Sequence, residues 1–216
     1  MIKDLILQDN TNQRLPCVVL LDGSTSMDGK AIDNLNQGLS ILERELKADD
    51  VASLRVQLLL LRIGGHSDVE ILTDWTDAID FSAPQVEANG TTPLGKGVNV
   101  ALRQLEDQKK KYRQNQITYN RPWLFIITDG APTDLNWERA AEKAVEAEKK
   151  GKVVVFPIGT EEADFEILNK FSSRGAIMLK NLDFKELFVW LSQSVSAGSQ
   201  TEINSETQLP AISWGA

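Results

Sequence analysis

Short apolar runs alternate along this chain with longer segments in which apolar residues recur at every third or fourth position. Short apolar runs are typical of buried strands, whereas the wider spacing is typical of amphipathic helices. The pattern predicts strands at residues 15–21, 53–63, 69–73, 122–128, 152–158 and 176–179. It predicts helices at residues 30–47, 93–113, 137–150, 163–172 and 184–196.

The link between the second and third predicted strands, residues 64–68, is too short for a helical crossover, so these strands should pair antiparallel. The other strands alternate with helices, which favours a mostly parallel sheet covered on both faces. We therefore predict an α/β fold: a doubly wound, Rossmann-like, three-layer α/β/α sandwich. Its mostly parallel central sheet should carry one antiparallel edge strand.

One domain accounts for this pattern, because no Gly or Pro break divides the core in two. We assign residues 1–13 to an N-terminal extension, residues 14–197 to the domain and residues 198–216 to a flexible C-terminal tail. The tail is inferred because the composition turns to Ser, Gln, Thr and Glu after Ala197. Trp214 in this tail belongs either to a disordered segment or to a short docking segment.

Composition narrows the classes of function. The 216 residues carry 31 acidic and 23 basic side chains, a net charge of −8, which argues against a general nucleic-acid binder. One cysteine, Cys17, excludes an internal disulfide, and one histidine, His66, excludes a multi-histidine zinc site. No apolar stretch approaches the roughly 20 residues that span a membrane. Asp4 interrupts the first apolar run, so we do not expect a signal peptide. We therefore expect a cytoplasmic location.

Two aspartates follow apolar strands and indicate metal chemistry. Asp22 opens the segment Asp22-Gly-Ser24-Thr-Ser26, which offers one carboxylate and two hydroxyl oxygens, and Asp129 follows the 122–128 strand. Oxygen ligands of this kind suit hard cations such as Mg²⁺ or Mn²⁺. In doubly wound sheets, ligands gather at the carboxyl ends of strands where the strand order reverses. If the two strands are neighbours at that point, both carboxylates face one crevice.

Three ordered segments resemble the von Willebrand factor A domain and its metal-ion-dependent adhesion site. They are Asp22-Gly-Ser24-Thr-Ser26, the Gly-Thr-Thr-Pro-Leu-Gly run at residues 90–95, and Thr128-Asp-Gly130. The resemblance implies the same sandwich fold and a metal held by Asp22, Ser24, Ser26, Thr92 and Asp129. Many members have Gly-Gly-Thr where this chain has Gly-Thr-Thr, so Thr91 is a possible substitute for Thr92, which the spacing favours.

Within that family, residues 128–134 and 183–195 look like the cytoplasmic bacterial TerY type. Proteins of this type are linked with tellurium-resistance and stress operons. The resemblance therefore suggests a protein kinase and a protein-phosphatase-2C-like phosphatase as partners.

These features predict a non-enzymatic, metal-dependent protein-interaction module, in which a partner carboxylate completes the metal shell. One alternative is a Mg²⁺-dependent phosphohydrolase of the haloacid-dehalogenase type, but Ser24 stands where that class needs a second aspartate. Another is an accessory subunit of an AAA+ insertase or chelatase. Since the chain has no nucleotide-binding loop, the ATPase would be a separate protein.

Overall fold

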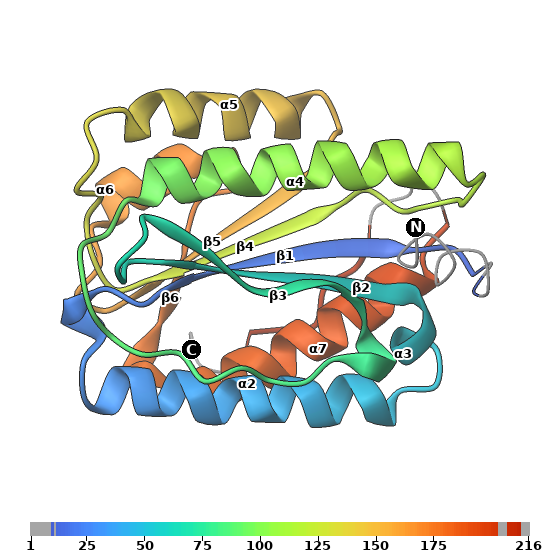
Figure 1. Cartoon of the computed structure of the whole chain (residues 1–216), viewed down its shortest axis with the longest axis horizontal. Coiled ribbons are helices and arrows are strands. Elements are labelled where there is room, and N and C mark those ends of the chain that lie inside the picture. The colour runs from blue at the N-terminus through green and yellow to red at the C-terminus, as the bar shows by residue number, and fades with distance from the viewer. Residues whose placement is uncertain (1–9, 11, 203–206, 213–216) are drawn as a thin grey trace.

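The computed structural model describes residue 10, residues 12–202 and residues 207–212, and Figure 1 shows a central sheet between two helical layers. The strands are β1 (Leu15–Asp22), β2 (Val56–Ile63), β3 (Val69–Asp77), β4 (Trp123–Thr128), β5 (Val154–Thr160) and β6 (Ile177–Leu179). The α-helices are α2 (Lys30–Ala48), α3 (Ala52–Arg55), α4 (Leu94–Gln114), α5 (Trp137–Lys149), α6 (Phe165–Leu168) and α7 (Phe184–Gln200). Short 3₁₀ turns are η1 (Thr25–Met27), η2 (Ala78–Asp80), η3 (Asn169–Phe171) and η4 (Lys180–Leu182).

The six-stranded sheet has the order β3-β2-β1-β4-β5-β6. Every neighbouring pair is parallel except β2 and β3, which are antiparallel. The predicted α/β sandwich with one antiparallel edge strand is therefore confirmed. The chain builds outward from β1 in one direction and then returns to add β4 on its other side, so the strand order reverses between β1 and β4.

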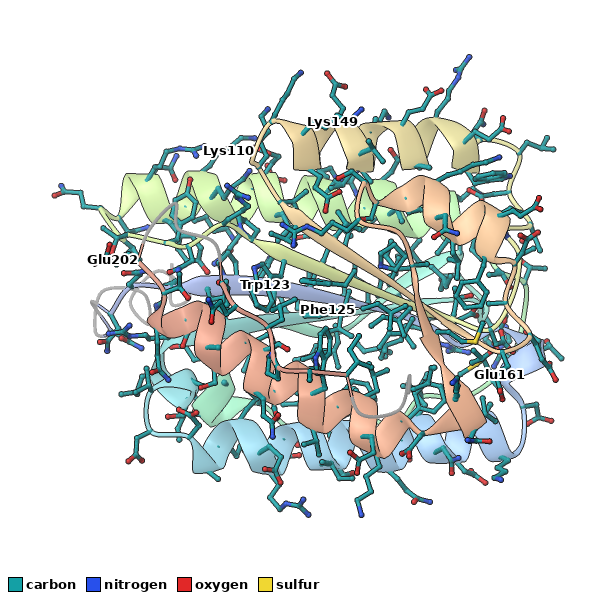
Figure 2. The ribbon with its side chains drawn as sticks, turned by 180° about the vertical axis from the view of Figure 1, so that it is seen from behind. Lys110, Trp123, Phe125, Lys149, Glu161 and Glu202 are labelled. Carbon is teal, nitrogen blue, oxygen red and sulfur yellow. The ribbon has the colours of Figure 1, made fainter. Side chains whose placement is uncertain are left out.

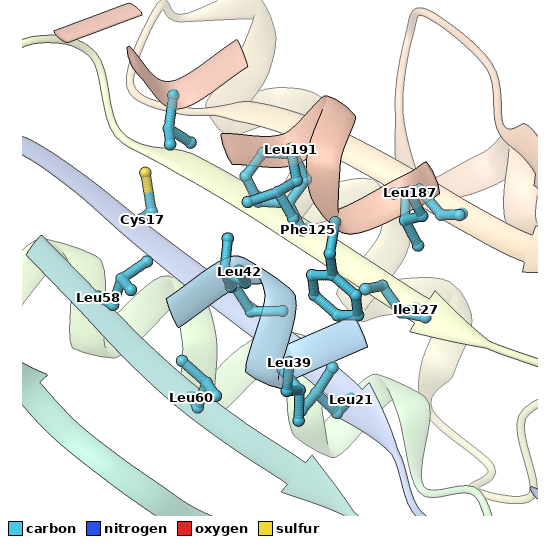
Figure 3. Close-up of a cluster of buried hydrophobic side chains, with 14 of the residues drawn as sticks. Cys17, Leu21, Leu39, Leu42, Leu58, Leu60, Phe125, Ile127, Leu187 and Leu191 are labelled. Carbon is cyan, nitrogen blue, oxygen red and sulfur yellow. The ribbon is translucent and has the colours of Figure 1, made fainter. Parts of the chain in front are cut away.

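Alternate residues of β1 supply two cores. Cys17, Val19 and Leu21 belong to the apolar cluster beneath α2 and α7, which Figure 3 shows in part. Val18 and Leu20 point the other way and pack with residues of α4 and α5. Because strand side chains alternate between faces, one wholly apolar strand serves both layers.

Several predicted elements differ in the structure. The strand predicted at residues 69–73 continues to Asp77. The strand predicted at residues 53–63 begins only at Val56, because residues 52–55 form the short helix α3. Asp49 caps this turn: its Oδ1 accepts hydrogen bonds from the Val51 and Ala52 amides at 2.9 and 2.8 Å. The helix predicted at residues 163–172 is the pair α6 and η3. Apolar content alone does not distinguish a strand from a short buried helix.

The C-terminal helix also runs further than its composition indicates. α7 continues to Gln200, and Gly198 lies so close to Trp123 that a β-carbon there would stand 2.8 Å from the indole ring. Leu209 and Ile212, from the predicted flexible tail, pack against the core below α7. The Trp190 indole Nε1 donates a hydrogen bond to the Pro210 carbonyl at 3.0 Å. The described part of the tail is therefore docked, and Trp214 lies outside the described residues.

None of the helices in the described ranges has both the length and the apolar character needed to cross a bilayer.

Candidate metal centre

β1 and β4 bring the two aspartates to one edge of the sheet. The strands pair in parallel, with Leu21 opposite Ile127, so Asp22 and Asp129 follow at nearly the same level. Asp22 is fully buried and Asp129 is 8% exposed. The edge where they meet is the place of strand-order reversal, as topology alone leads one to expect.

Neutral donors hold the Asp22 carboxylate. Its Oδ1 accepts a hydrogen bond from the Ser24 amide at 2.9 Å, and its Oδ2 accepts a short one from the Thr128 hydroxyl. Within the described part of the chain, no lysine, arginine or histidine forms an ion pair with Asp22. A buried carboxylate without a cationic partner is unusual, because burying an unpaired charge is unfavourable.

Ser24, whose amide donates to Asp22, is linked through the Ser26 hydroxyl to Asp129. Ser24 Oγ and Ser26 Oγ are 3.0 Å apart, and Ser26 Oγ donates to Asp129 Oδ1 at 2.9 Å. The two carboxylates and two hydroxyls therefore form one continuous group of oxygen atoms. Oxygen-only donor sets of this kind match the preference of Mg²⁺ and Mn²⁺.

Thr92, rather than Thr91, lies beside this group. A β-carbon built on Gly130 would stand 3.7 Å from Thr92 Oγ1 and 3.9 Å from Ser26 Oγ, so both hydroxyls border the same glycine. Thr92 is buried and Thr91 is exposed. The Thr92 amide donates to Thr133 Oγ1 at 3.1 Å, and the Thr133 amide donates to the Thr92 carbonyl at 2.9 Å. The loop after β4 thus holds Thr92 in place.

The electrostatics of the two acids favour a bound cation. Burial raises the pKa of Asp22 above its ordinary value, although hydrogen bonds from Ser24 and Thr128 oppose this. Burial, together with the charge of Asp22, raises the pKa of Asp129. A divalent cation between them would offset both the desolvation and the mutual repulsion.

The donor set limits which metals fit. Among the described residues, no group of three or more His, Cys, Asp or Glu side chains is placed to hold a metal ion. A metal at this edge would therefore depend on the two carboxylates together with the hydroxyls of Ser24, Ser26 and Thr92. That set fits a hard cation.

Arg62 supports the site, and sequence reasoning did not single it out. Its buried guanidinium donates from Nη2 to the Gly23 carbonyl at 3.4 Å and to Asn89 Oδ1 at 3.0 Å. Its Nη1 forms an ion pair with Glu70 Oε2 at 3.2 Å. Arg62 thus ties the loop after β1 to the segment that precedes Thr92. The signal in the sequence is an arginine in β2, a buried strand whose residues are apolar apart from Gln57 and Arg62.

Asp134 is a second support. Its two carboxylate oxygens accept from the Gly95 and Lys96 amides at 3.1 and 2.9 Å, in the first turn of α4. The amide groups of a helix start lack partners within the helix, so this side chain caps α4 and fixes the loop that carries Thr92.

A family model for the von Willebrand factor type A domain matches residues 17–189. The chain belongs to this family. Its domains commonly serve as metal-dependent protein-interaction modules, and the residues that resemble the family's metal site are those gathered at the edge between β1 and β4. No curated protein sequence matches the chain.

Solved structures with the same fold are distant in sequence. The ArnB paralog VWA2 from Sulfolobus acidocaldarius is 20% identical, with a TM-score of 0.57 over 85% of this chain and 46% of that one. The von Willebrand factor domain of the type V pili tip protein Mfa5 from Porphyromonas gingivalis is 11% identical, with a TM-score of 0.62 over 90% of this chain and 99% of that one. Proximal thread matrix protein 1 from the mussel byssus is 13% identical, with a TM-score of 0.56 over 87% of this chain and 49% of that one. It was solved with a zinc-occupied MIDAS motif. This chain spans less than half the length of several of the chains it matches.

Proposed function

We propose that this protein is a non-enzymatic, metal-dependent protein-interaction module. Asp22, Ser24, Ser26, Thr92 and Asp129 would hold Mg²⁺ or Mn²⁺ in a metal-ion-dependent adhesion site. The observation that carries the proposal is the pair of buried carboxylates linked through Ser24 and Ser26, with no cationic side chain paired to Asp22 in the described part of the chain.

The charges explain why such a site would capture a partner. The two carboxylates offset the two charges of the ion, and the hydroxyl ligands add none. If only one aspartate contacts the ion directly, the ion keeps an electron-poor position for a Glu or Asp of a partner. The chain's own residues prepare this position: the Ser24 amide and the Thr128 hydroxyl orient Asp22, and Thr133 holds the Thr92 backbone.

Calorimetric titration of Mg²⁺ and Mn²⁺ tests the metal site. The metal-free wild type should bind one ion, and Asp22→Ala should bind none while keeping its fold by circular dichroism. Glu138→Gln is the matched control, because Glu138 is exposed on α5 and its loss changes the net charge equally. Failure of the wild type to bind either ion would contradict the proposal.

The geometry does not favour the phosphohydrolase alternative. An aspartate nucleophile must reach its substrate, but Asp22 is fully buried and both of its oxygens already accept hydrogen bonds. Hydrolysis of p-nitrophenyl phosphate that disappears in Asp22→Ala would reverse this judgement.

We further propose the cytosolic setting that the TerY resemblance suggests, a tellurium-resistance or stress-response complex with a protein kinase and a protein-phosphatase-2C-like phosphatase. Mg²⁺-dependent capture from cytosol, compared between wild type and Asp22→Ala, identifies the partner by mass spectrometry. Capture of the kinase or the phosphatase by the wild type alone supports this setting. Capture of an AAA+ ATPase in their place would favour the insertase or chelatase role.

A further inference from the structure

A cleft of about 440 Å³ opens directly beside the candidate metal centre. Ser26 and Asp129 line it, and so do residues of the loops after β5 and β6. Figure 2 labels Glu161 of the loop after β5, at the sheet edge where the site loops gather. The volume falls within the range of about 300–1,000 Å³ that is usual for ligand pockets.

The cleft is strongly acidic in addition to Asp129. Asp28, Glu161 and Glu162 line it, and the one basic residue among its lining is Lys30. All four are exposed, and none takes part in an ion pair between described residues. Glu161 accepts a hydrogen bond from the Asn181 amide at 3.2 Å, which holds its carboxylate at the cleft. A pocket lined mainly by charges of one sign concentrates the opposite charge.

Thr160 provides an independent sign that a ligand belongs here. It is the last residue of β5, is 2% exposed and lines the cleft. Its Oγ1 is buried and has no hydrogen-bond partner among the described residues. Leaving a buried polar group without a partner is unfavourable by roughly 1–3 kcal/mol. An N–H donor entering the cleft would remove that penalty.

The floor of the cleft is partly apolar. Leu182 and Ala31 line it, and Leu182 packs on the core cluster beneath α7. Lysine and arginine lay their aliphatic stems along apolar surface while keeping their charged heads near acidic or solvated groups. The cleft offers both kinds of surface to one side chain.

We propose that this cleft binds a lysine or arginine side chain of the partner, next to the partner carboxylate at the metal. The partner segment would then carry one acidic and one basic residue close together. This inference rests on the proposed function, since the metal site sets the position of the acidic residue. It adds a specificity element that a metal ion alone does not supply, because any exposed carboxylate could bind the ion.

Short blocked peptides of Gly and Ser test the inference on the full chain by amide NMR titration with saturating Mg²⁺. Each peptide carries one glutamate and one lysine, with spacings from adjacent to about four positions on either side. A matched set replaces lysine with norleucine, and another replaces glutamate with glutamine. At the best spacing, the lysine peptide should bind roughly three to ten times more tightly than its norleucine counterpart, and the advantage should shrink with added salt.

Two variants locate the effect. Glu161→Gln with Glu162→Gln should remove most of the lysine advantage while the norleucine peptide still binds. The matched control is Glu138→Gln with Glu142→Gln, two exposed acids of α5, which should retain the advantage. Thr160→Val, of nearly equal volume, should weaken the lysine peptide alone.

The outcomes separate the two proposals. Norleucine and lysine peptides that bind equally in Mg²⁺ would overturn the cleft inference and leave the metal-dependent function standing. Binding by neither set would overturn both. Lysine peptides that bind equally well with and without Mg²⁺, and with and without glutamate, would support the cleft and contradict the metal-dependent capture.

Discussion

The two ends of the sheet each bury an aspartate, and the two aspartates have different partners. Asp77 ends β3 at the amino end of the parallel strands, where the Arg14 guanidinium pairs with its Oδ2 at 2.9 Å and Gln57 Nε2 donates to its Oδ1 at 2.9 Å. Asp22 at the carboxyl end is held by neutral donors, among them the Ser24 amide and the Thr128 hydroxyl, and forms no ion pair with a described residue. The first charge has a cationic partner within the chain, whereas the second has none among the described residues.

The contrast indicates which end serves stability and which serves function. Around Asp77 the network continues into α4, because Gln57 Oε1 accepts from Gln108 Nε2 at 2.6 Å and from the Tyr112 hydroxyl at 2.5 Å. Around Asp22 the network ends at Asp129, beside an open cleft. The amino end therefore ties elements together, and the carboxyl end is where we propose that a ligand binds.

The largest expected effect is at the amino end. Asp77→Ala leaves the fully buried Arg14 guanidinium without its carboxylate, and breaking a buried pair in this way costs roughly 3–5 kcal/mol. Urea denaturation of the metal-free protein measures the loss in the free energy of unfolding. A loss below about 1 kcal/mol would show that this pair is not a stabilising element and would remove the contrast between the two ends.

Unlike Asp77→Ala, Asp22→Asn should not lower the free energy of unfolding of the metal-free protein. The metal-free variant should be as stable as the wild type or more stable, because an amide replaces a buried charge. It should lose the stabilisation by Mg²⁺, which for the wild type is about 2.7 kcal/mol at one hundred times the dissociation constant. Thermal unfolding with and without Mg²⁺ measures both. Equal stabilisation of wild type and variant by Mg²⁺ would place the metal elsewhere.

Arg62→Lys probes the support of the site. Lysine keeps the charge but loses the fork that reaches the Gly23 carbonyl, Asn89 and Glu70 together. Metal affinity should fall by about tenfold, as when groups that orient metal ligands are replaced. Arg139→Lys on the exposed side of α5 is the control for titration calorimetry. An unchanged affinity would mean that the loops hold their positions without Arg62.

Asp49, which caps α3, gives the smallest effect and a pH dependence. Burial raises its pKa, but hydrogen bonds from Ala52, Ser196 and Val51 outweigh burial, so its pKa in the folded state lies below the ordinary value. The cap therefore stabilises the fold above the ordinary aspartate pKa of about 3.9, and this contribution disappears as pH falls through the lower folded value.

Asp49→Asn, which removes the negative charge at the start of α3, should accordingly lower the free energy of unfolding by roughly 0.3–1 kcal/mol at neutral pH, and this difference should vanish in acid. For Asp22, the dependence of stability on pH has the opposite sign. Its raised pKa means that the metal-free fold loses stability as pH rises through the folded value. Urea denaturation across pH measures both variants against the wild type. Differences from the wild type that stay constant across pH would contradict the assigned directions.

Much of the fold was predictable from local pattern. The wholly apolar run of β1 predicted a strand buried on both faces, and the short 64–68 link predicted the antiparallel pair of β2 and β3. Residues 52–55 escaped prediction because α3 depends on its cap at Asp49 and on packing, neither of which apolar content shows. The packing of Leu209 and Ile212 on the core was not predicted for a similar reason, since a mainly polar composition does not show which of the few apolar residues make contacts.

The residues of the candidate site also fall into two groups, those that the local sequence brings together and those that only the tertiary structure brings together. The sequence by itself determined that the candidate donors Asp22, Ser24 and Ser26 lie close together, because their separation along the chain already limits their separation in space. Only the tertiary structure shows that Thr92, and not Thr91, lies beside them. It also brought Thr128 to Asp22 across 106 positions and placed Thr160 in the cleft beside Asp129. Contacts between distant segments depend on strand order and register, and these follow from how the two cores pack against the sheet rather than from any local run of residues.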